Sequence, residues 1–90
     1  MRTIERTTRF KKDYKREKKT SPTLDDVLIP VIELLATDGD LPERLKDHAL
    51  SGDWAGYRDC HVRPDLVLIY KKPEGALSLA RLGSHSEVFG

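Results

Sequence analysis

The chain holds three histidines, His48, His61 and His85, and imidazole is the side chain best suited to moving protons near neutral pH. All three fall at the ends of segments that read as consecutive strands, among acidic residues and one arginine, Arg81. Strand ends and the loops beyond them are where a rigid scaffold presents reactive groups. The spacing therefore predicts an acid–base site assembled from all three rings.

His61 and Asp65 flank the short connection Val62-Arg63-Pro64 between two predicted strands. Because a tight hairpin brings its ends together, the carboxylate could orient or charge the imidazole. The alternative is that Asp65 only caps the turn, as aspartate often does. Cys60 could act as a nucleophile, but strand alternation places it on the face opposite His61, which favours a small core residue.

A metal hydrolase is a second reading of the same residues. His48, His61, Asp65 and His85 could supply three imidazoles and one carboxylate to a zinc ion. The chain lacks the short ligand spacings, such as H-x-x-x-H, that usually accompany such a site. We therefore expect no metal and no cofactor.

Hydrophobic periodicity and turn residues define the elements that must position these side chains. A short strand is predicted at Arg2–Thr7 and a basic amphipathic helix at Thr8–Lys19. A second helix, with Ser21 as its N-cap and a kink or late start at Pro30, should reach Thr37. The remaining predictions are a loop over Asp40–Gly52, with one helical turn at Pro42–Lys46, and strands at Trp54–Val62, Leu66–Lys71 and Ala76–Leu82.

This order, β-α-α-β-β-β, predicts an α+β fold in which two N-terminal helices cover one face of a small, mainly antiparallel, twisted sheet. The other face should be open and polar, and the histidines could act there. We expect residues 1–90 to form a single domain, since 90 residues support one core. With one cysteine, Cys60, and no long apolar stretch, the chain is expected to be cytoplasmic and to avoid membranes.

Charge is distributed unevenly along the chain. The first twenty residues hold nine Lys/Arg against three Asp/Glu, and the other seventy hold seven against twelve. A basic segment of this kind favours contact with a polyanion or an acidic partner, although a solvated helix face explains it equally well. The candidate residues for this contact, which the resemblance described next implies to be RNA-binding residues, are Lys11, Lys12, Lys15, Arg16, Lys18, Lys19, Lys46, Arg58 and Arg63.

Four sequence patterns occur in order in the second half of the chain: KDH, L-x-G-x-W-x-G-Y-R-D, H-V-x-P-D and G-x-H-x-x-x-F-G. Together, over Leu45–Gly90, they resemble the YafQ branch of the RelE-type bacterial toxins. The resemblance implies a RelE-like ribonuclease fold and an endoribonuclease that cuts mRNA on the ribosome. It also implies a hetero-oligomer with a cognate antitoxin whose other half binds DNA.

The matched positions imply a catalytic set, which comprises His48, His61, Asp65, Arg81, His85 and Phe89. His85 and Asp65 are the leading candidates for general acid or base, and Phe89 could stack on an RNA base or pin the chain end to the sheet. Leu66 stands where the family pattern has tryptophan, which removes an aromatic surface. That difference keeps open a third reading, a non-catalytic RNA- or ribosome-binding module.

Overall fold

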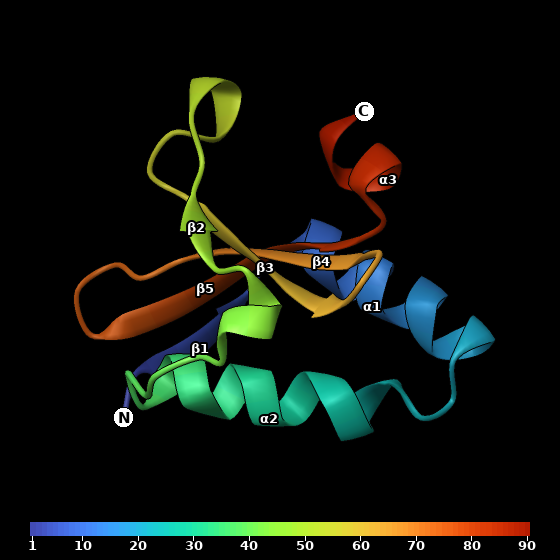
Figure 1. Ribbon diagram of the computed structural model, residues 1–90, viewed down its shortest axis with the longest axis horizontal. Coiled ribbons are helices and arrows are strands. Elements are labelled where there is room, and N and C mark those ends of the chain that lie inside the picture. The colour runs from blue at the N-terminus through green and yellow to red at the C-terminus, as the bar shows by residue number, and fades with distance from the viewer.

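The computed structural model describes residues 1–90 and contains five strands and three α-helices (Figure 1). The strands are β1 (Thr3–Arg6), β2 (His48–Ala49), β3 (Arg58–Arg63), β4 (Leu66–Lys71) and β5 (Ala76–Gly83). The helices are α1 (Thr8–Thr20), α2 (Leu24–Ala36) and α3 (His85–Phe89). None of the three has the length and apolar character of a membrane span. The predicted α+β class is confirmed.

The strands form one sheet in the order β1-β5-β4-β3-β2. β1 runs parallel to β5, and the other neighbouring pairs are antiparallel. The parallel pairing follows from the two helices, which carry the chain from β1 back to the far side of the sheet before the meander begins. β4, which is apolar along five of its six residues, lies at the centre and is buried on both faces.

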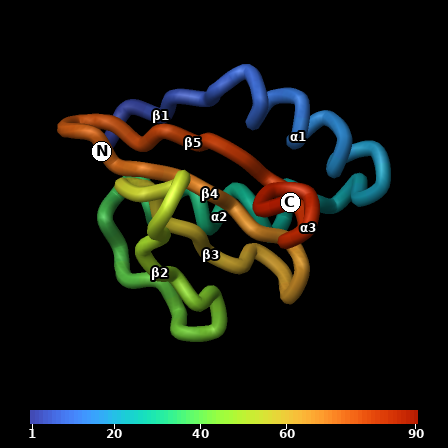
Figure 2. The backbone as a smooth tube through the Cα atoms, turned by 90° about the horizontal axis from the view of Figure 1, so that it is seen from above, coloured from blue at the N-terminus to red at the C-terminus, as the bar shows by residue number.

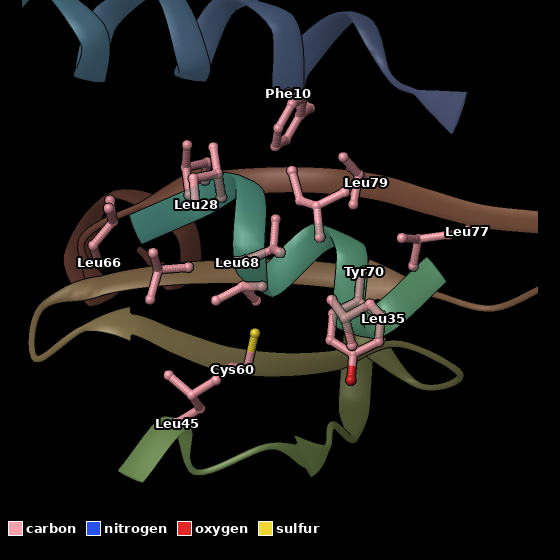
Figure 3. Packing of buried hydrophobic residues seen from close by; sticks show 14 of the residues in the cluster. Phe10, Leu28, Leu35, Leu45, Cys60, Leu66, Leu68, Tyr70, Leu77 and Leu79 are labelled. Atoms are coloured by element: carbon pink, nitrogen blue, oxygen red, sulfur yellow. The ribbon is translucent and has the colours of Figure 1, made fainter. Parts of the chain in front are cut away.

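Helix α2 packs across one face of the sheet, as predicted, and α1 lies along the β5 edge, where its apolar side chains join the same core (Figures 2 and 3). Their apolar side chains share a single core with inward-facing residues of β3, β4 and β5 (Figure 3). Phe10 enters it from α1, Leu28 and Leu35 enter it from α2, and Leu68 and Leu79 meet them from the sheet. The i, i+4 and i+7 spacing of the α2 residues produced this buried stripe.

Polar side chains of α1 complete the part of β5 that lies beyond the end of β1. Thr7 donates its hydroxyl to the Ala80 carbonyl at 2.9 Å. Further along, Asp13 accepts from the Leu82 amide at 3.1 Å and Arg16 donates to the Leu82 carbonyl at 3.0 Å. These bonds occupy strand-edge groups that would otherwise need water or another strand.

The opposite face of the sheet is only partly open. The loop between β2 and β3 and the helix α3 both rise from this face, on the side away from α2 (Figures 1 and 2). Between them lies a small apolar cluster of Val67, Ile69, Ala80 and Val88. Trp54 and Tyr57 pack against that cluster from the β2–β3 loop, with ring centroids 5.1 Å apart. The prediction of an open, polar face is therefore wrong in part.

Several predicted boundaries also need correction. Trp54 lies in a 3₁₀ turn and β3 begins only at Arg58, because the turn between them, with Gly56 at φ +90°, breaks the extended backbone. Ser21 ends α1 and does not cap α2, which starts at Leu24 after Thr23 and continues through Pro30. β2 and α3 were not predicted, whereas the helical turn within Pro42–Lys46 is present at Glu43–Leu45.

Candidate active site

His85 lies at the first position of α3, where a capping box fixes the backbone. Ser84 accepts from the Glu87 amide, and the Glu87 carboxylate accepts from the Ser84 amide at 2.9 Å. The side chain of His85 then reaches Asp65 in the β3–β4 turn, with Nδ1 3.1 Å from Oδ1. The His85 amide donates to the same oxygen at 3.3 Å, so one carboxylate holds both ring and backbone.

Two more rings surround His85. The His61 ring, on β3, meets it edge to face with centroids 4.9 Å apart, and the Phe89 ring lies 6.1 Å away one turn further along α3. Phe89 is 42% exposed, so its ring is not buried as a pin for the chain end. Asp65 is paired with His85, whereas the hairpin argument had offered two alternatives, a contact with His61 or a cap on the turn.

His48 lies on the other side of the site, on β2, directly across from Asp59 of β3. Its Nδ1 is 2.8 Å from Asp59 Oδ1 and 2.9 Å from the Lys46 carbonyl oxygen. The ring N–H is aligned with the carbonyl, which leaves the carboxylate oxygen close to Nδ1 but without an aligned hydrogen bond. Asp59 is buried, while His48 is more than half exposed.

The two carboxylates beside these histidines have opposite pKa shifts. Burial raises the pKa of Asp59, although the nearby imidazoles of His48, His61 and His85 offset part of the rise. The hydrogen bond from the His85 ring, followed by that from its amide, lowers the pKa of Asp65. His48 lies opposite Asp59, Asp59 stands two positions before His61 on β3, and His61 contacts His85, so the three predicted histidines lie in one region of the sheet.

Arg81 is held at the edge of this cluster. A bulge at Ala80 places Arg81 opposite Ile69, on the histidine face of the sheet. Its Nε donates to Asp13 at 2.7 Å, and its terminal nitrogen approaches the Glu87 carbonyl of α3 at 3.4 Å. Burial opposes ionisation of Asp13, but the hydrogen bonds from Arg81 and the Leu82 amide hold its pKa below the usual value.

Leu66 and Cys60 face away from the histidines. Leu66 is buried in the core beneath α2, near Leu28, and Cys60 lies in the same core (Figure 3). Burial raises the pKa of the Cys60 thiol to about 12, so it is no nucleophile at neutral pH. Leu66, which stands where the family pattern has tryptophan, therefore contributes to the hydrophobic core of this chain.

The predicted RNA-binding residues divide into two groups. Lys11, Lys12, Lys15 and Lys19 are exposed on α1 and make no ion pair or side-chain hydrogen bond. The others are largely occupied: Arg16 with Asp13 and Glu17, Lys18 with Asp25, Arg58 with Asp47 and Arg63 with Ser21, while Lys46 lies in the turn before His48.

This arrangement can exchange protons at two separate imidazoles. In each, Nδ1 lies against an acceptor, so Nε2 is the nitrogen free to serve a substrate. No group of three or more histidine, cysteine, aspartate or glutamate side chains is arranged as a ligand set for a metal ion. Because Nε2 of His48 and of His85 is not held by the protein, the geometry favours acid–base chemistry by the imidazoles themselves.

Sequence reasoning missed two residues of this region. Asp59 stands two positions before His61, so strand alternation places both on one face, and that signal was available. Asp13 gave no such signal, because a single aspartate within a basic helix usually faces solvent. The S-x-x-E spacing of Ser84 and Glu87, which is the pattern of a capping box, could have predicted α3.

Comparison with known proteins gives one consistent family. Residues 2–90 match the family described as the bacterial toxin of type II toxin-antitoxin system, YafQ. The mRNA interferase toxin YafQ of Escherichia coli K12 is 38% identical over 89 residues, which span 99% of this chain and 97% of that protein.

Solved structures agree with that comparison. The crystal structure of the E. coli DinJ-YafQ complex matches with a TM-score of 0.89 and 40% identity, and it covers all of both chains. A metal-bound toxin from Helicobacter pylori matches with a TM-score of 0.92 and 43% identity over 99% of this chain and 100% of that one. Sequence and fold thus lead to the same set of toxins.

Proposed function

The chain belongs to the YafQ family of toxins from type II toxin-antitoxin systems, and from this premise we propose that it cleaves mRNA on the ribosome without a metal ion. It is an endoribonuclease of the mRNA-interferase type, like the E. coli relative that is 38% identical over the whole chain. The observation that carries the mechanism is the contact between His61 and His85, with Asp65 on one side and Phe89 on the other.

The reaction needs two proton transfers. A base takes the proton of the ribose 2′-OH while its oxygen attacks phosphorus, and an acid protonates the 5′-oxygen as its bond to phosphorus breaks. Asp65 holds Nδ1 of His85, so that Nε2 of this ring can exchange a proton with the substrate. We assign His85, supported by Asp65, as one of the two groups, and His61 and His48 as those that share the other transfer.

Two side chains complete the proposed site. Arg81 supplies positive charge beside the phosphate, and its bonds to Asp13 and the Glu87 carbonyl keep it in place before the substrate binds. Phe89, exposed next to His85, offers a face on which a nucleobase can stack. With Leu66 buried in the core, Phe89 is the aromatic surface next to the histidines in this chain.

The ribosome is the proposed setting because α1 carries a free basic surface. Lys11, Lys12, Lys15 and Lys19 have no acidic partner, so each can contact a phosphate of ribosomal RNA. Arg58 and Arg63 are less available, since they hold Asp47 and Ser21. Binding of this kind should weaken steeply as salt increases.

An antitoxin is the proposed partner. The E. coli YafQ relative has been solved in complex with DinJ, and we propose that residues 1–90 act as one toxin domain in a comparable hetero-oligomer. The antitoxin should carry an acidic or amphipathic segment toward this toxin, and its other half should bind DNA. Co-expression with the neighbouring reading frame should restore growth and allow the two proteins to be purified together.

One experiment separates the proposal from its two alternatives. The purified toxin is incubated with mRNA, alone and on programmed ribosomes, with and without excess EDTA, and the new 5′ ends are mapped. Cleavage that requires the ribosome and is unaffected by EDTA supports the proposal. Cleavage abolished by EDTA and restored by a divalent ion indicates a metal hydrolase, and intact mRNA on toxin-bound ribosomes indicates a non-catalytic module.

A further inference from the structure

Asp59 is a buried carboxylate that the fold leaves without a hydrogen bond. Its side chain is 3% exposed, and its Oδ1 has no hydrogen-bond partner. Burying a carboxylate oxygen without a hydrogen bond is unfavourable, because the bonds that it makes to water are lost and not replaced. Such groups persist in native proteins where they serve a purpose other than stability.

The charged groups around Asp59 indicate its role. The charges that act on it are the imidazoles of His48, His61 and His85, with Asp47 as a repelling carboxylate. No lysine or arginine bonds to it. Its shortest contact is Nδ1 of His48, 2.8 Å away across the β2–β3 pair. The carboxylate is therefore directed into the cluster of histidines.

Both atoms next to Nδ1 of His48 are acceptors, because one is the Asp59 carboxylate and the other is the Lys46 carbonyl. Nδ1 must then carry hydrogen, which leaves the lone pair of the neutral ring on Nε2. That is the tautomer required of a base whose exposed side faces a substrate. A proton taken up at Nε2 gives an imidazolium directly beside the buried carboxylate.

We propose that Asp59 is a positioning residue. Together with the Lys46 carbonyl it keeps hydrogen on Nδ1 of His48, and its charge stabilises the imidazolium that forms when His48 accepts the 2′-OH proton. The proposal rests on the ribonuclease function proposed above. A purely structural role explains the geometry less well. The β2–β3 ribbon is already held by strand pairing and by the bond from the Leu50 amide to the Tyr57 carbonyl at 2.9 Å.

A double-mutant cycle tests the pair directly. Single-turnover cleavage of ribosome-bound mRNA is measured for Asp59→Asn, His48→Ala and the double variant. Asp59→Asn should slow cleavage by about 10²-fold when His48 is present and by about twofold at most when it is absent. Asp53→Asn, at an exposed aspartate in the loop between β2 and β3, is the matched control and should cut at the wild-type rate.

The proposal is overturned if Asp59→Asn reduces the cleavage rate by the same factor in the His48→Ala background as in the wild-type background. Wild-type cleavage by Asp59→Asn would overturn it too. A second measurement applies even if Asp59→Asn does not fold. The Asp59 carboxyl is titrated by carbon-13 NMR in the wild type and in His48→Ala.

Loss of the His48 charge should move the titration of Asp59 to higher pH, since that imidazole favours the ionised carboxylate. An unchanged titration would refute the coupling of the two side chains. This measurement needs no RNA. If the wild-type protein fails to cut mRNA, the proposed function falls, and the NMR titration still decides whether Asp59 and His48 act as a pair.

Discussion

The site contains two histidine–aspartate pairs that are similar in separation but differ in hydrogen bonding and in burial. Nδ1 of His48 lies 2.8 Å from Asp59, and Nδ1 of His85 lies 3.1 Å from Asp65. Yet the Asp59 side chain is 3% exposed and that of Asp65 is 73% exposed. Burial raises the pKa of Asp59, whereas the His85 hydrogen bonds lower the pKa of Asp65.

The difference shows that the residue types of a pair do not determine what the pair does. A charge in a buried place interacts strongly with its neighbour, because little water screens it. An exposed charge orients its neighbour mainly through the hydrogen bond, and salt weakens the rest. We expect the buried pair to stabilise a protonated ring and the exposed pair to fix the position of one.

The largest expected effect comes from removing the imidazole of the exposed pair. His85→Ala should reduce the single-turnover cleavage rate by about 10³-fold, within the usual range for a general acid or base. His85 contacts His61, Asp65 and Phe89, so its loss disrupts the whole cluster. His48→Ala should reduce the cleavage rate by a smaller factor, since His61 can still act as the base. Glu74→Gln, in the distant β4–β5 turn, is the control and should cut at the wild-type rate. Equal losses would contradict this ranking of the two pairs.

Phe89→Ala tests the ring that flanks only one of the pairs. Cleavage should fall by about tenfold through weaker positioning of the mRNA, in line with the loss of one base–aromatic stack. The free energy of unfolding should fall by only about 1–2 kcal/mol, because the residue is 42% exposed. Phe89→Tyr keeps the aromatic face and should restore the rate; a rate restored equally by Phe89→Leu would argue against stacking.

Asp65→Asn should have a smaller effect, which depends on salt. We expect a loss of about threefold to fivefold in cleavage rate at low ionic strength, because the exposed ion pair contributes little and the amide can still bond to the ring. The ratio of wild-type to variant rates should shrink as salt is added. For Asp59→Asn that ratio should stay constant, and a parallel salt dependence would remove the contrast between the pairs.

The smallest effect is a difference in the sign of the pH dependence of stability. Asp65 has a lowered pKa in the folded state, so it stabilises the fold above the ordinary pKa of 3.8 and loses that contribution in acid. Asp59 has a raised pKa, so its contribution is present in acid and is lost as pH rises through the folded-state value. The stability of Asp65→Asn relative to wild type should therefore fall as pH rises toward neutral. The stability of Asp59→Asn relative to wild type should rise over the same range. Chemical denaturation from pH 3 to 7 measures both.

The sequence predicted correctly those features that follow from local hydrophobic periodicity. The apolar stripe of α2, the buried run of β4 and the alternation that separates Cys60 from His61 all follow from local patterns. The convergence of the histidines also follows, because a meander returns its loops to common edges. The same local patterns predicted the α+β class correctly.

What local patterns could not supply were contacts between distant segments. Asp65 is near His61 in sequence, but the capped start of α3 brings His85 to it instead. Asp13 is buried because it bonds to Arg81 and Leu82, which lie 68 and 69 positions away. Leu66 was expected to weaken a stacking surface, and only the register of β4 shows that it faces the core.

The pairing of the first strand with the last has a consequence for the time at which the toxin becomes active. β1 finds its partner only in β5, and the bond from Arg81 to Asp13 spans most of the chain. Because chain segments of such large separation associate late in folding, the sheet cannot close before residues 76–83 have been synthesised. His85 follows them, so the site cannot form until a ribosome has synthesised every residue from β1 through His85.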